Sequence, residues 1–419
     1  MVTDMNTNTE LRNDAMYIIE NTLKEINPKK AVQDVLTGYD SNAYIFAIGK
    51  AAWTMASAAG EALGERVLGG IVITKYGHSM GEIGNLRIFE AGHPLPDENG
   101  TVASEYAVNF FGSLSAGDNI IFLISGGGSA LFECPEEGVS LKDIEQLSKE
   151  LLSCGADIKQ INTVRKRLSK VKGGKFAKLC EPARIQSIIL SDVLGDDPSF
   201  IASGPAYVDS GEPDGAVKII KKYDIQVPGH LLPLLKRALP TEITNVETRI
   251  IGSVRQLCET VSNISEKIGY STYILTENMT CQAREAGSLI GSIAARNAVT
   301  PAFDLPCAIL FGGETVVKVT GEGKGGRNQE IALAAAAHIS GLDNVCIFSL
   351  GSDGTDGPTD AAGAVIDGYS YGNYHDLGYL PEDYLDNNNS YELLKACGDL
   401  LVTGPTGTNV NDVTVVLIK

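Results

Sequence analysis

The sequence lacks the marks of a membrane, secreted or disulfide-stabilised protein. It contains no run of about 20 apolar residues that could span a bilayer as a helix. The N-terminal segment MVTDMNTNTELRNDAMYIIE has no basic region followed by an apolar stretch, so it does not resemble a signal peptide. The eight cysteines form no CxxC motif, which predicts reduced thiols rather than disulfides or a zinc site. These absences predict a cytoplasmic protein with no membrane partner.

Basic residues are also scarce. Lysine and arginine together number 34, against 52 aspartate and glutamate residues, which gives a net charge of −18. Such a balance excludes a surface built to bind nucleic acid or anionic lipid. If the substrate is an anion, a local group of basic side chains must hold it against the overall field. The composition leaves open whether the protein forms a homo-oligomer.

What is present is an ordinary globular composition on a long chain. With 419 residues, of which 43% are hydrophobic, the chain exceeds the roughly 250 to 300 residues at which a single core usually stops growing, so two domains are expected. Short apolar runs alternate with helical patterns, which favours α/β domains with buried, mostly parallel strands. These runs lie at 44–48, 70–74, 119–124 and 185–190 in the first half, and near 251, at 272–275, 307–311, 345–350 and 413–418 in the second.

A break between the two halves predicts the domain boundary. Three prolines within residues 228–240 interrupt the helical pattern before a new strand begins. We therefore predict a Rossmann-like N-terminal domain with a mostly parallel sheet over residues 1–238, which includes an opening amphipathic helix. A smaller α/β domain is predicted over residues 239–419. The natural ligand site is then the cleft between the two domains.

Glycine-rich turns follow several predicted strands, at the edge where α/β sheets bind ligands. Lys50, in AIGKAA, lies between a strand and a helix, where its ammonium and the helix N-terminus attract an anion. In LISGGGSALF, successive unobstructed N–H groups favour a nest for phosphate or carboxylate. A solvated lysine and a tight turn are the structural alternatives, and no P-loop is present. The turn consists of Ser125, Gly126, Gly127, Gly128 and Ser129.

Acidic side chains follow another predicted strand, in SDVLGDDP. Asp192 ends the strand, and Asp196 and Asp197 follow in the loop. Neighbouring carboxylates repel unless a cation or a basic partner is near, and hard oxygen ligands suit Mg²⁺. Asp192 is alternatively a group that accepts a proton from a substrate hydroxyl. Asp197, directly before a proline, is typical of a turn.

Two charged candidates lie in FGGETVVKVTGEGKGGRNQE, which is interpreted as a hairpin joined to an Ala-rich helix. Arg327 is placed at a flexible entrance to this helix, where it can clamp a phosphate or carboxylate with two hydrogen bonds. Glu314 follows two glycines at the end of a predicted strand and is expected to face the same cleft.

Two motifs near the C-terminus add polar candidates. Asp353 and Asp356 in SDGTDGPTD, spaced by glycines, resemble a loop that binds a cation or a hydroxyl, although the full EF-hand pattern is absent. In TGPTGTNVND, Thr408 and Asn409 supply neutral hydrogen-bonding groups just before the last strand. The candidate metal ligands are Asp192, Glu314 and Asp353.

Two further features carry less weight. His93 in AGHPLPDENG has no second histidine or cysteine at ligand spacing, so no metal site is predicted there. The basic stretch VRKRLSKVKGGK, residues 164–175, is interpreted as a solvated helix face, because the chain as a whole is acidic.

Together the motifs resemble those of the class II glycerate 2-kinases. The resemblance runs from about residue 40 to the C-terminus, in one order and without large gaps. It rests on AIGKAA, GHPLPDENG, ISGGGSAL, INTVRK with KGG, SDVLGDDP with IASGP, GGETVVKVTGEGKGGRNQE, SDGTDGPTDAAGAVID and TGPTGTNVND. It implies phosphorylation of D-glycerate by ATP, with Mg²⁺, to give 2-phospho-D-glycerate for the lower part of glycolysis. It also implies a two-domain α/β scaffold with the active site in the cleft.

The same resemblance implies roles for individual residues. Lys50 and Arg327 match the key basic positions of the family. The matching polar positions associated with its active site are Asp192, Glu314, Asp353 and Asn409. Departures from the family pattern leave the reaction class intact but put the substrate preference in question. They are Arg167 in place of histidine, Leu194 in place of proline, and Phe132, Glu133 and Cys134 after the glycine turn.

Three alternatives are considered at this point. The first is a non-catalytic protein whose acidic loops only bind a small ligand, although the charged residues at strand ends in both halves speak against it. A kinase of this kind could place the phosphate on the 3-hydroxyl, because the regiochemistry depends on which hydroxyl faces the γ-phosphate. An oxidoreductase acting on glycerate or hydroxypyruvate would also use α/β units. However, no G-x-G-x-x-G opens a helix after a strand with an acidic residue about 20 positions on.

Overall fold

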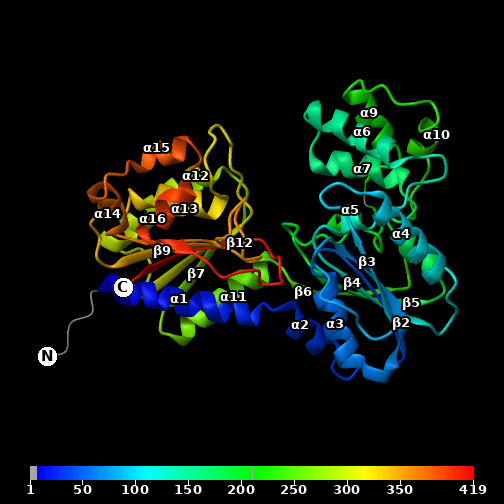
Figure 1. The fold of residues 1–419 in the computed structure, drawn as a ribbon, viewed down its shortest axis with the longest axis horizontal. Helices are drawn as coiled ribbons and strands as arrows, with labels where there is room; N and C mark the ends of the chain where they lie inside the picture. Colours follow the sequence, from blue (N-terminus) through cyan, green and yellow to red (C-terminus); the bar gives the residue numbers. More distant parts are fainter. Residues whose placement is uncertain (1–6, 210) are drawn as a thin grey trace. The chain divides into compact units, whose positions relative to one another are not determined.

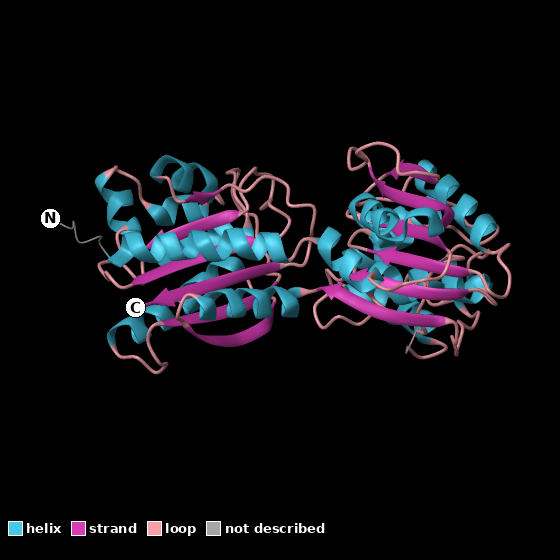
Figure 2. Ribbon diagram, turned by 90° about the horizontal axis from the view of Figure 1, so that it is seen from below, coloured by secondary structure: helices cyan, strands magenta, loops and turns pink. Residues whose placement is uncertain are grey.

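A computed structural model describes residues 7–209 and 211–419, so residues 1–6 and Ser210 of the first predicted domain lie outside it. The chain forms two compact units (Figure 1). Residues 28–251 form the parallel-sheet unit, and the segments before residue 28 and after residue 251 form the mixed-sheet unit. Helices lie over the strands of both sheets (Figure 2). The predicted α/β class with two units is confirmed.

The parallel-sheet unit contains a six-stranded sheet of order β3-β2-β1-β4-β5-β6. Strands β1 to β5 pair in parallel, as their apolar runs predict. The strands are β1 (Ala43–Ile48), β2 (Val67–Lys75), β3 (Leu86–Ala91), β4 (Asn119–Ile124), β5 (Arg184–Leu190) and β6 (Val246–Gly252). The helices are α2 (Pro28–Leu36), α3 (Ala52–Leu63), η1 (Gly64–Arg66), α4 (Glu98–Phe111), α5 (Gly128–Leu131), α6 (Leu141–Ser153), α7 (Ile158–Leu168), α8 (Lys175–Cys180), η2 (Ile201–Ser203), α9 (Gly215–Lys222) and α10 (Leu232–Leu235).

Aromatic side chains fill the core behind the glycine turn. Phe132 packs edge-on against Phe46, with ring centroids 5.0 Å apart, and against Phe176 at 5.3 Å. Phe122 stacks on Phe46 at 4.9 Å. Phe132, one of the departures from the family pattern, is thus a core residue that supports the turn from behind. Helices α6, α7, α9 and α10 enclose a separate small core and lie together in Figure 1.

The mixed-sheet unit has the strand order β11-β10-β9-β12-β8-β7. Strands β7 and β8 pair in parallel, whereas β12 is antiparallel to β8 and β9, and β10 is antiparallel to β9 and β11. The strands are β7 (Ser271–Met279), β8 (Cys307–Gly313), β9 (Val345–Gly351), β10 (Gly363–Asp367), β11 (Leu400–Leu401) and β12 (Asp412–Ile418). The helices are α1 (Thr7–Glu25), α11 (Val254–Lys267), α12 (Ala283–Val299), α13 (Arg327–Ala336), α14 (Ser370–Asp376), α15 (Pro381–Asp386) and α16 (Ser390–Cys397).

The expectation that the second half repeats the parallel pattern was wrong. Strands β9 and β12 are buried along their whole length, so their sequences are continuous apolar runs. Burial on both faces produces such runs in an antiparallel strand as well, when helices cover the two sides of the sheet. In this unit α1 and α11 lie on one side and α12 and α13 on the other (Figure 1).

The domain boundary also differs from the prediction of 1–238 and 239–419. Strand β6 belongs to the parallel sheet, so that unit extends to residue 251. Helix α1 packs on the mixed-sheet unit because Arg12 donates to Asp367, to Ser370 Oγ (2.9 Å) and to Asp399 Oδ1 (2.8 Å). Its buried face, which includes Leu11, completes the core of that unit. Ion pairs between segments far apart in the sequence leave no local pattern that would predict this.

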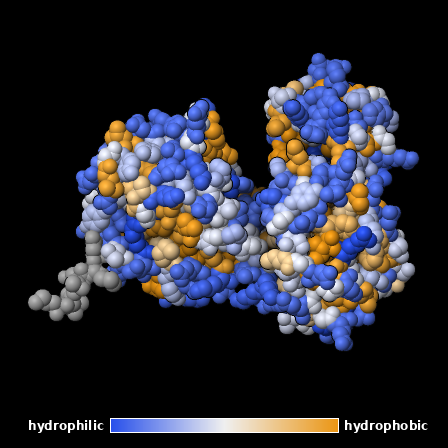
Figure 3. Space-filling model, in the orientation of Figure 1, coloured by the Kyte–Doolittle hydropathy of each residue, from blue (hydrophilic) through white to orange (hydrophobic). Residues whose placement is uncertain are grey.

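Between β8 and α13 the structure has no hairpin. Residues 314–326 contribute only an isolated bridge at Val316, and the rest of the segment runs without strand pairing. None of the described helices combines the length and the apolar character needed to cross a bilayer. On the face seen in Figure 3, apolar side chains lie in small groups among hydrophilic ones.

Candidate active site

The turns after β1 and β4 are joined by hydrogen bonds at the carboxyl edge of the parallel sheet. The N–H of Lys50 donates to the carbonyl of Gly126 (2.8 Å), and the N–H of Ala51 donates to Ser125 Oγ (3.1 Å). Gly49 has a φ of +115°, and a Cβ there would lie 2.2 Å from Ser125 Oγ. Only glycine allows this approach. Lys50 and the glycine turn, predicted separately, are therefore parts of one structure.

Asp192 and His93 lie against the same turn. A Cβ on Gly126 would meet Asp192 Oδ2 at 2.2 Å, and one on Gly127 would meet His93 Cδ2 at 2.9 Å and Lys50 Cγ at 3.3 Å. The structure thus brings Lys50 and Asp192, each predicted at the end of a separate strand, into contact with the same turn. We call Lys50, His93, Gly126–Ser129 and Asp192 the glycine-turn cluster.

The sequence singled out His93 only as a possible metal ligand, so its place in this cluster was not predicted. Burial, with the positive charges of Lys50 and Lys75, lowers the pKa of His93 to about 4. The imidazole is therefore neutral at pH 7, with nitrogen atoms that can accept or donate a hydrogen bond. A search for metal-ligand spacing could not find it, because its neighbours in space are a lysine and a glycine.

The loop after Asp192 is held in unusual backbone conformations. Asp196, Ala202 and Ser203 have positive φ angles of 54°, 51° and 62°. Ser203 Oγ lies 2.7 Å from Ser129 Oγ, so the last residue of the glycine turn is fixed to this loop. Asp197 accepts the N–H of Ser199 (2.9 Å), as expected for a turn residue. Such conformations cost about 1–3 kcal/mol each, and they persist where the surroundings impose them.

The basic stretch 164–175 is not a solvated face. Lys166, Arg167 and Lys172 are exposed by only 1%, 2% and 0%. Lys172 Nζ donates to the carbonyl of Ser129 (2.7 Å) and pairs with Glu133 (3.4 Å). The buried lysine therefore holds the end of the glycine turn, and Glu133, a departure from the family pattern, balances its charge.

Arg167 is also explained by contacts that sequence alone could not show. It donates to the carbonyl oxygens of Arg237, Glu212 (3.4 Å) and Pro213 (3.0 Å). This departure from the family pattern thus ties α7 to two loops of its own unit. Leu194 makes no contact that explains its substitution.

We expect the pH dependence of stability to reveal the buried Lys172. Burial lowers its pKa from 10.5 to about 8. Because Lys172 binds its proton less tightly in the folded chain than in the unfolded chain, the free energy of unfolding rises as the pH rises from about 8 to about 10.5. This contribution is complete above about pH 10.5 and is lost by about pH 8. In Lys172→Met, the free energy of unfolding in urea should lack this rise, which reaches about 1.4 kcal/mol per pH unit. Lys142→Met, at an exposed site, is the control, and equal slopes in the two variants would contradict the assignment.

A second cluster lies in the mixed-sheet unit, where α13 begins. Arg327 donates through Nε and Nη2 to the two oxygens of Asp412, the latter bond being 3.0 Å, and through Nη1 to Glu314 Oε1 (3.0 Å). Asp412 is the first residue of β12 and faces Gly313 of β8 and Gly351 of β9 in the register. Because β12 runs antiparallel to both strands, its start meets their ends at one edge. We call Arg327, Asp412 and Glu314 the arginine cluster.

Asp412 was missed at the level of sequence. It lies in TGPTGTNVND, but nothing in the sequence around a single carboxylate before a strand predicts an ion pair with Arg327, which is 85 residues away. Burial raises its pKa to about 6, although Arg327 pulls in the opposite direction. Protonation of Asp412 as the pH falls through about 6 therefore weakens the hold on Arg327.

The loops beside the arginine cluster contain the remaining predicted residues. Asp353 accepts the N–H and the hydroxyl of Thr355 (3.0 and 3.1 Å), and its carbonyl accepts the N–H of Thr406 (3.3 Å). Thr408 is buried, with no partner for its hydroxyl in the described residues. Asn409 is half-buried in the same loop.

Asp356 has a structural role rather than the predicted ligand role. Its carboxylate accepts the N–H groups of Asn328 (3.2 Å) and Gln329 (2.9 Å), so it caps the N-terminus of α13. It is 2% exposed, and burial raises its pKa.

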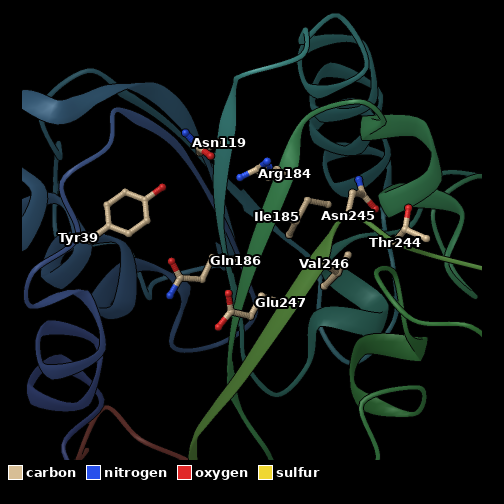
Figure 4. A pocket seen from close by; sticks show the side chains of 9 residues that line it. All are labelled: Tyr39, Asn119, Arg184, Ile185, Gln186, Thr244, Asn245, Val246 and Glu247. Atoms are coloured by element: carbon tan, nitrogen blue, oxygen red, sulfur yellow. The ribbon is translucent and has the colours of Figure 1, made fainter.

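The candidate metal ligands are divided between the units: Asp192 lies in one, and Glu314 and Asp353 in the other. Across residues 7–209 and 211–419, no three His, Cys, Asp or Glu side chains are gathered so that they could hold a metal ion. A cavity of about 330 Å³ lies at the opposite edge of the parallel sheet, where β4 and β5 begin (Figure 4). It is lined by Asn119 and Arg184 among others and contains no predicted site residue.

The fold and the two clusters define an enzyme that handles a small anionic substrate. Lys50 and the glycine turn lie at the ligand-binding edge of an α/β sheet, in a chain whose net charge is −18. Family models match residues 14–236, with the description of a domain of unknown function, DUF4147, and residues 307–412, described as the MOFRL family.

Relatives identify the family. A D-glycerate 2-kinase of Thermotoga maritima is 45% identical over 97% of this chain and 98% of its own. The crystal structure of a glycerate kinase from Thermotoga maritima superposes with a TM-score of 0.95 at 44% identity, covering 98% of this chain and 100% of that one. The chain belongs to the class II glycerate 2-kinase family. The predicted family and the predicted enzyme class, a glycerate kinase, are confirmed.

Two of the relatives carry a different name. A protein of Agrobacterium vitis, provisionally named a hydroxypyruvate reductase, is 39% identical over 88% of this chain and 86% of its own. It shares the family but would act by a different reaction, which makes a direct test of oxidoreductase activity worthwhile.

Proposed function

We propose that the protein transfers the γ-phosphoryl group of ATP to the 2-hydroxyl of D-glycerate and forms 2-phospho-D-glycerate in the cytoplasm. The observation that carries this proposal is the glycine-turn cluster. It combines a cation and a carboxylate within contact distance of one turn, whose three glycines carry no side chains. Phosphoryl transfer asks a protein mainly for positioning and for stabilisation of charge on the phosphoryl oxygens, and these groups supply both.

Each member of the glycine-turn cluster has a distinct role in this proposal. Lys50 neutralises negative charge on the transferred phosphoryl group or on the glycerate carboxylate. The N–H groups of Gly126 and Gly127 would bind anionic oxygens, whereas that of Gly128 donates to the carbonyl of Ser125 (3.3 Å). Asp192 orients the 2-hydroxyl and accepts its proton.

The arginine cluster presents a second cation, in the mixed-sheet unit. Arg327 is a guanidinium about one-third exposed, held by Asp412 and Glu314. The two carboxylates fix its orientation and leave part of it accessible to an anion. Asp353, Thr408 and Asn409 lie on loops at the same edge and would bind substrate hydroxyls or nucleotide oxygens.

Magnesium would enter with the nucleotide. Mg²⁺ prefers oxygen ligands, keeps several waters, and usually takes only one or two protein carboxylates beside the substrate phosphates. Asp192 of the parallel-sheet unit and, separately, Glu314 and Asp353 of the mixed-sheet unit are carboxylates of this kind. When bound, the ion would neutralise charge on the phosphates.

The reaction is tested by mixing purified protein with ATP, Mg²⁺ and D-glycerate and following ADP release. We expect release that depends on all three components and is absent with glycerol, which lacks the carboxylate. Oxidation of NADH with hydroxypyruvate, in the absence of ADP release, would overturn the proposal in favour of a reductase.

A further inference from the structure

Three consecutive asparagines hold the glycine-rich segment that precedes Arg327. Asn388 Oδ1 accepts the N–H groups of Thr320 (2.7 Å) and Gly321 (2.9 Å). Asn387 accepts the N–H of Glu322 through Oδ1 (3.0 Å) and that of Gly323 through its carbonyl (2.9 Å). We call Asn387–Asn389 the asparagine clasp.

The clasp takes up the N–H groups of five successive residues. Asn389 Oδ1 accepts the last of them, from Lys324 (3.0 Å), and the carbonyl of Lys324 accepts the N–H of Tyr391 (3.0 Å). The N–H groups of residues 320–324 are therefore not offered to a phosphate, in spite of a composition that resembles a phosphate-binding loop. The glycines serve a different purpose: a Cβ on Gly321 or Gly323 would lie 2.3 or 2.4 Å from the clasp.

The clasp continues directly into the arginine cluster. Asn388 Nδ2 reaches back to Glu330 on α13 (3.4 Å) and to the carbonyl of Lys318 (3.2 Å). Gly326 packs on Asp356, the cap of α13, and Arg327 is the first residue of that helix. The segment was expected to be a flexible entrance, but it is fixed at successive points up to Arg327.

We propose that Asn387–Asn389 are positioning residues for Arg327 in phosphoryl transfer. They touch neither substrate in this assignment. They act by fixing the path of residues 320–326. Arg327, the first residue of α13, is then held with its guanidinium directed at Asp412 and Glu314. The inference rests on the proposed function of Arg327. It assigns the positioning of the Arg327 side chain to residues that lie outside both clusters.

The test compares two double variants in the full-length protein. Asn387→Ala/Asn389→Ala removes two side-chain acceptors, whereas Asn387→Asp/Asn389→Asp keeps an oxygen at each position. Because misplacement by about 1 Å can cost up to about 10²-fold, we expect the alanine pair to lower kcat about 10- to 10²-fold while KM for ATP and D-glycerate changes less than about threefold. The aspartate pair should restore most of the lost kcat.

Tyr371→Phe is the matched control, since it removes one hydrogen bond, to Glu382 (2.8 Å), from the same unit without touching the clasp. If the alanine pair does not fold, Asn389→Ala alone is measured. Wild-type kcat in the alanine variants, or equal impairment of the alanine and aspartate pairs, would overturn the inference. An inactive wild-type protein would instead refute the proposed function, so the two failures are distinguishable.

Discussion

Lys50→Met should lower kcat for phosphorylation of D-glycerate about 10²- to 10³-fold, by analogy with loss of a preorganised group that stabilises the transition state. The side chain of Lys50 lies against the glycine turn, with its Cγ 3.3 Å from the position of a Cβ built on Gly127. Initial rates of ADP release at saturating ATP and D-glycerate measure the effect.

The control for this variant is Lys29→Met. It removes a lysine that is 47% exposed and paired with Glu61 at the surface of the same unit. It changes the net charge equally, so it should leave kcat within about twofold of wild type because surface pairs contribute little. A Lys50→Met enzyme with nearly normal kcat would remove Lys50 from the catalytic assignment.

Arg327→Gln should affect both stability and turnover. Loss of the guanidinium leaves the buried carboxylate of Asp412 without its partner. Breaking a buried pair costs about 3–5 kcal/mol, and we expect the lower end because Arg327 is 32% exposed. The kcat should fall about 10²- to 10³-fold as well.

A second substitution separates the two effects. In Arg327→Gln/Asp412→Asn the buried charge is gone, so the free energy of unfolding should recover most of the loss, whereas kcat should stay low. Urea denaturation and steady-state rates on the same samples give both quantities. Recovery of kcat in the double variant would assign Arg327 a structural role only.

Much of the glycine-turn cluster could be predicted from the sequence for a physical reason. Lys50, Gly126–Ser129 and Asp192 each follow a buried parallel strand, and the carboxyl ends of parallel strands meet at one edge of a sheet. Strand order in the chain is then enough to bring them together. The same reasoning placed Glu314 and Asp353 at the ends of β8 and β9.

The parts that escaped prediction depend on contacts between distant segments. Asp412 opens a strand instead of ending one, so it joins the site only because β12 is antiparallel to its neighbours. The sequence predicts a surface position for Lys172, and only the structure shows that it pairs with Glu133 and donates to the carbonyl of Ser129. Helix α1 packs on the mixed-sheet unit, where Arg12 pairs with Asp367 and Asp399. The hydrophobic periodicity of the helix does not predict these partners.

The position of the new phosphate ester tests the central claim most directly. Purified protein is incubated with ATP, Mg²⁺ and D-glycerate, and the product is identified by phosphorus NMR against authentic 2- and 3-phosphoglycerate. The account predicts the signal of 2-phospho-D-glycerate, formed when Asp192 accepts the proton of the 2-hydroxyl beside the glycine turn. A signal of 3-phosphoglycerate would contradict that orientation of the substrate, and the absence of any phosphoglycerate would contradict the proposed reaction.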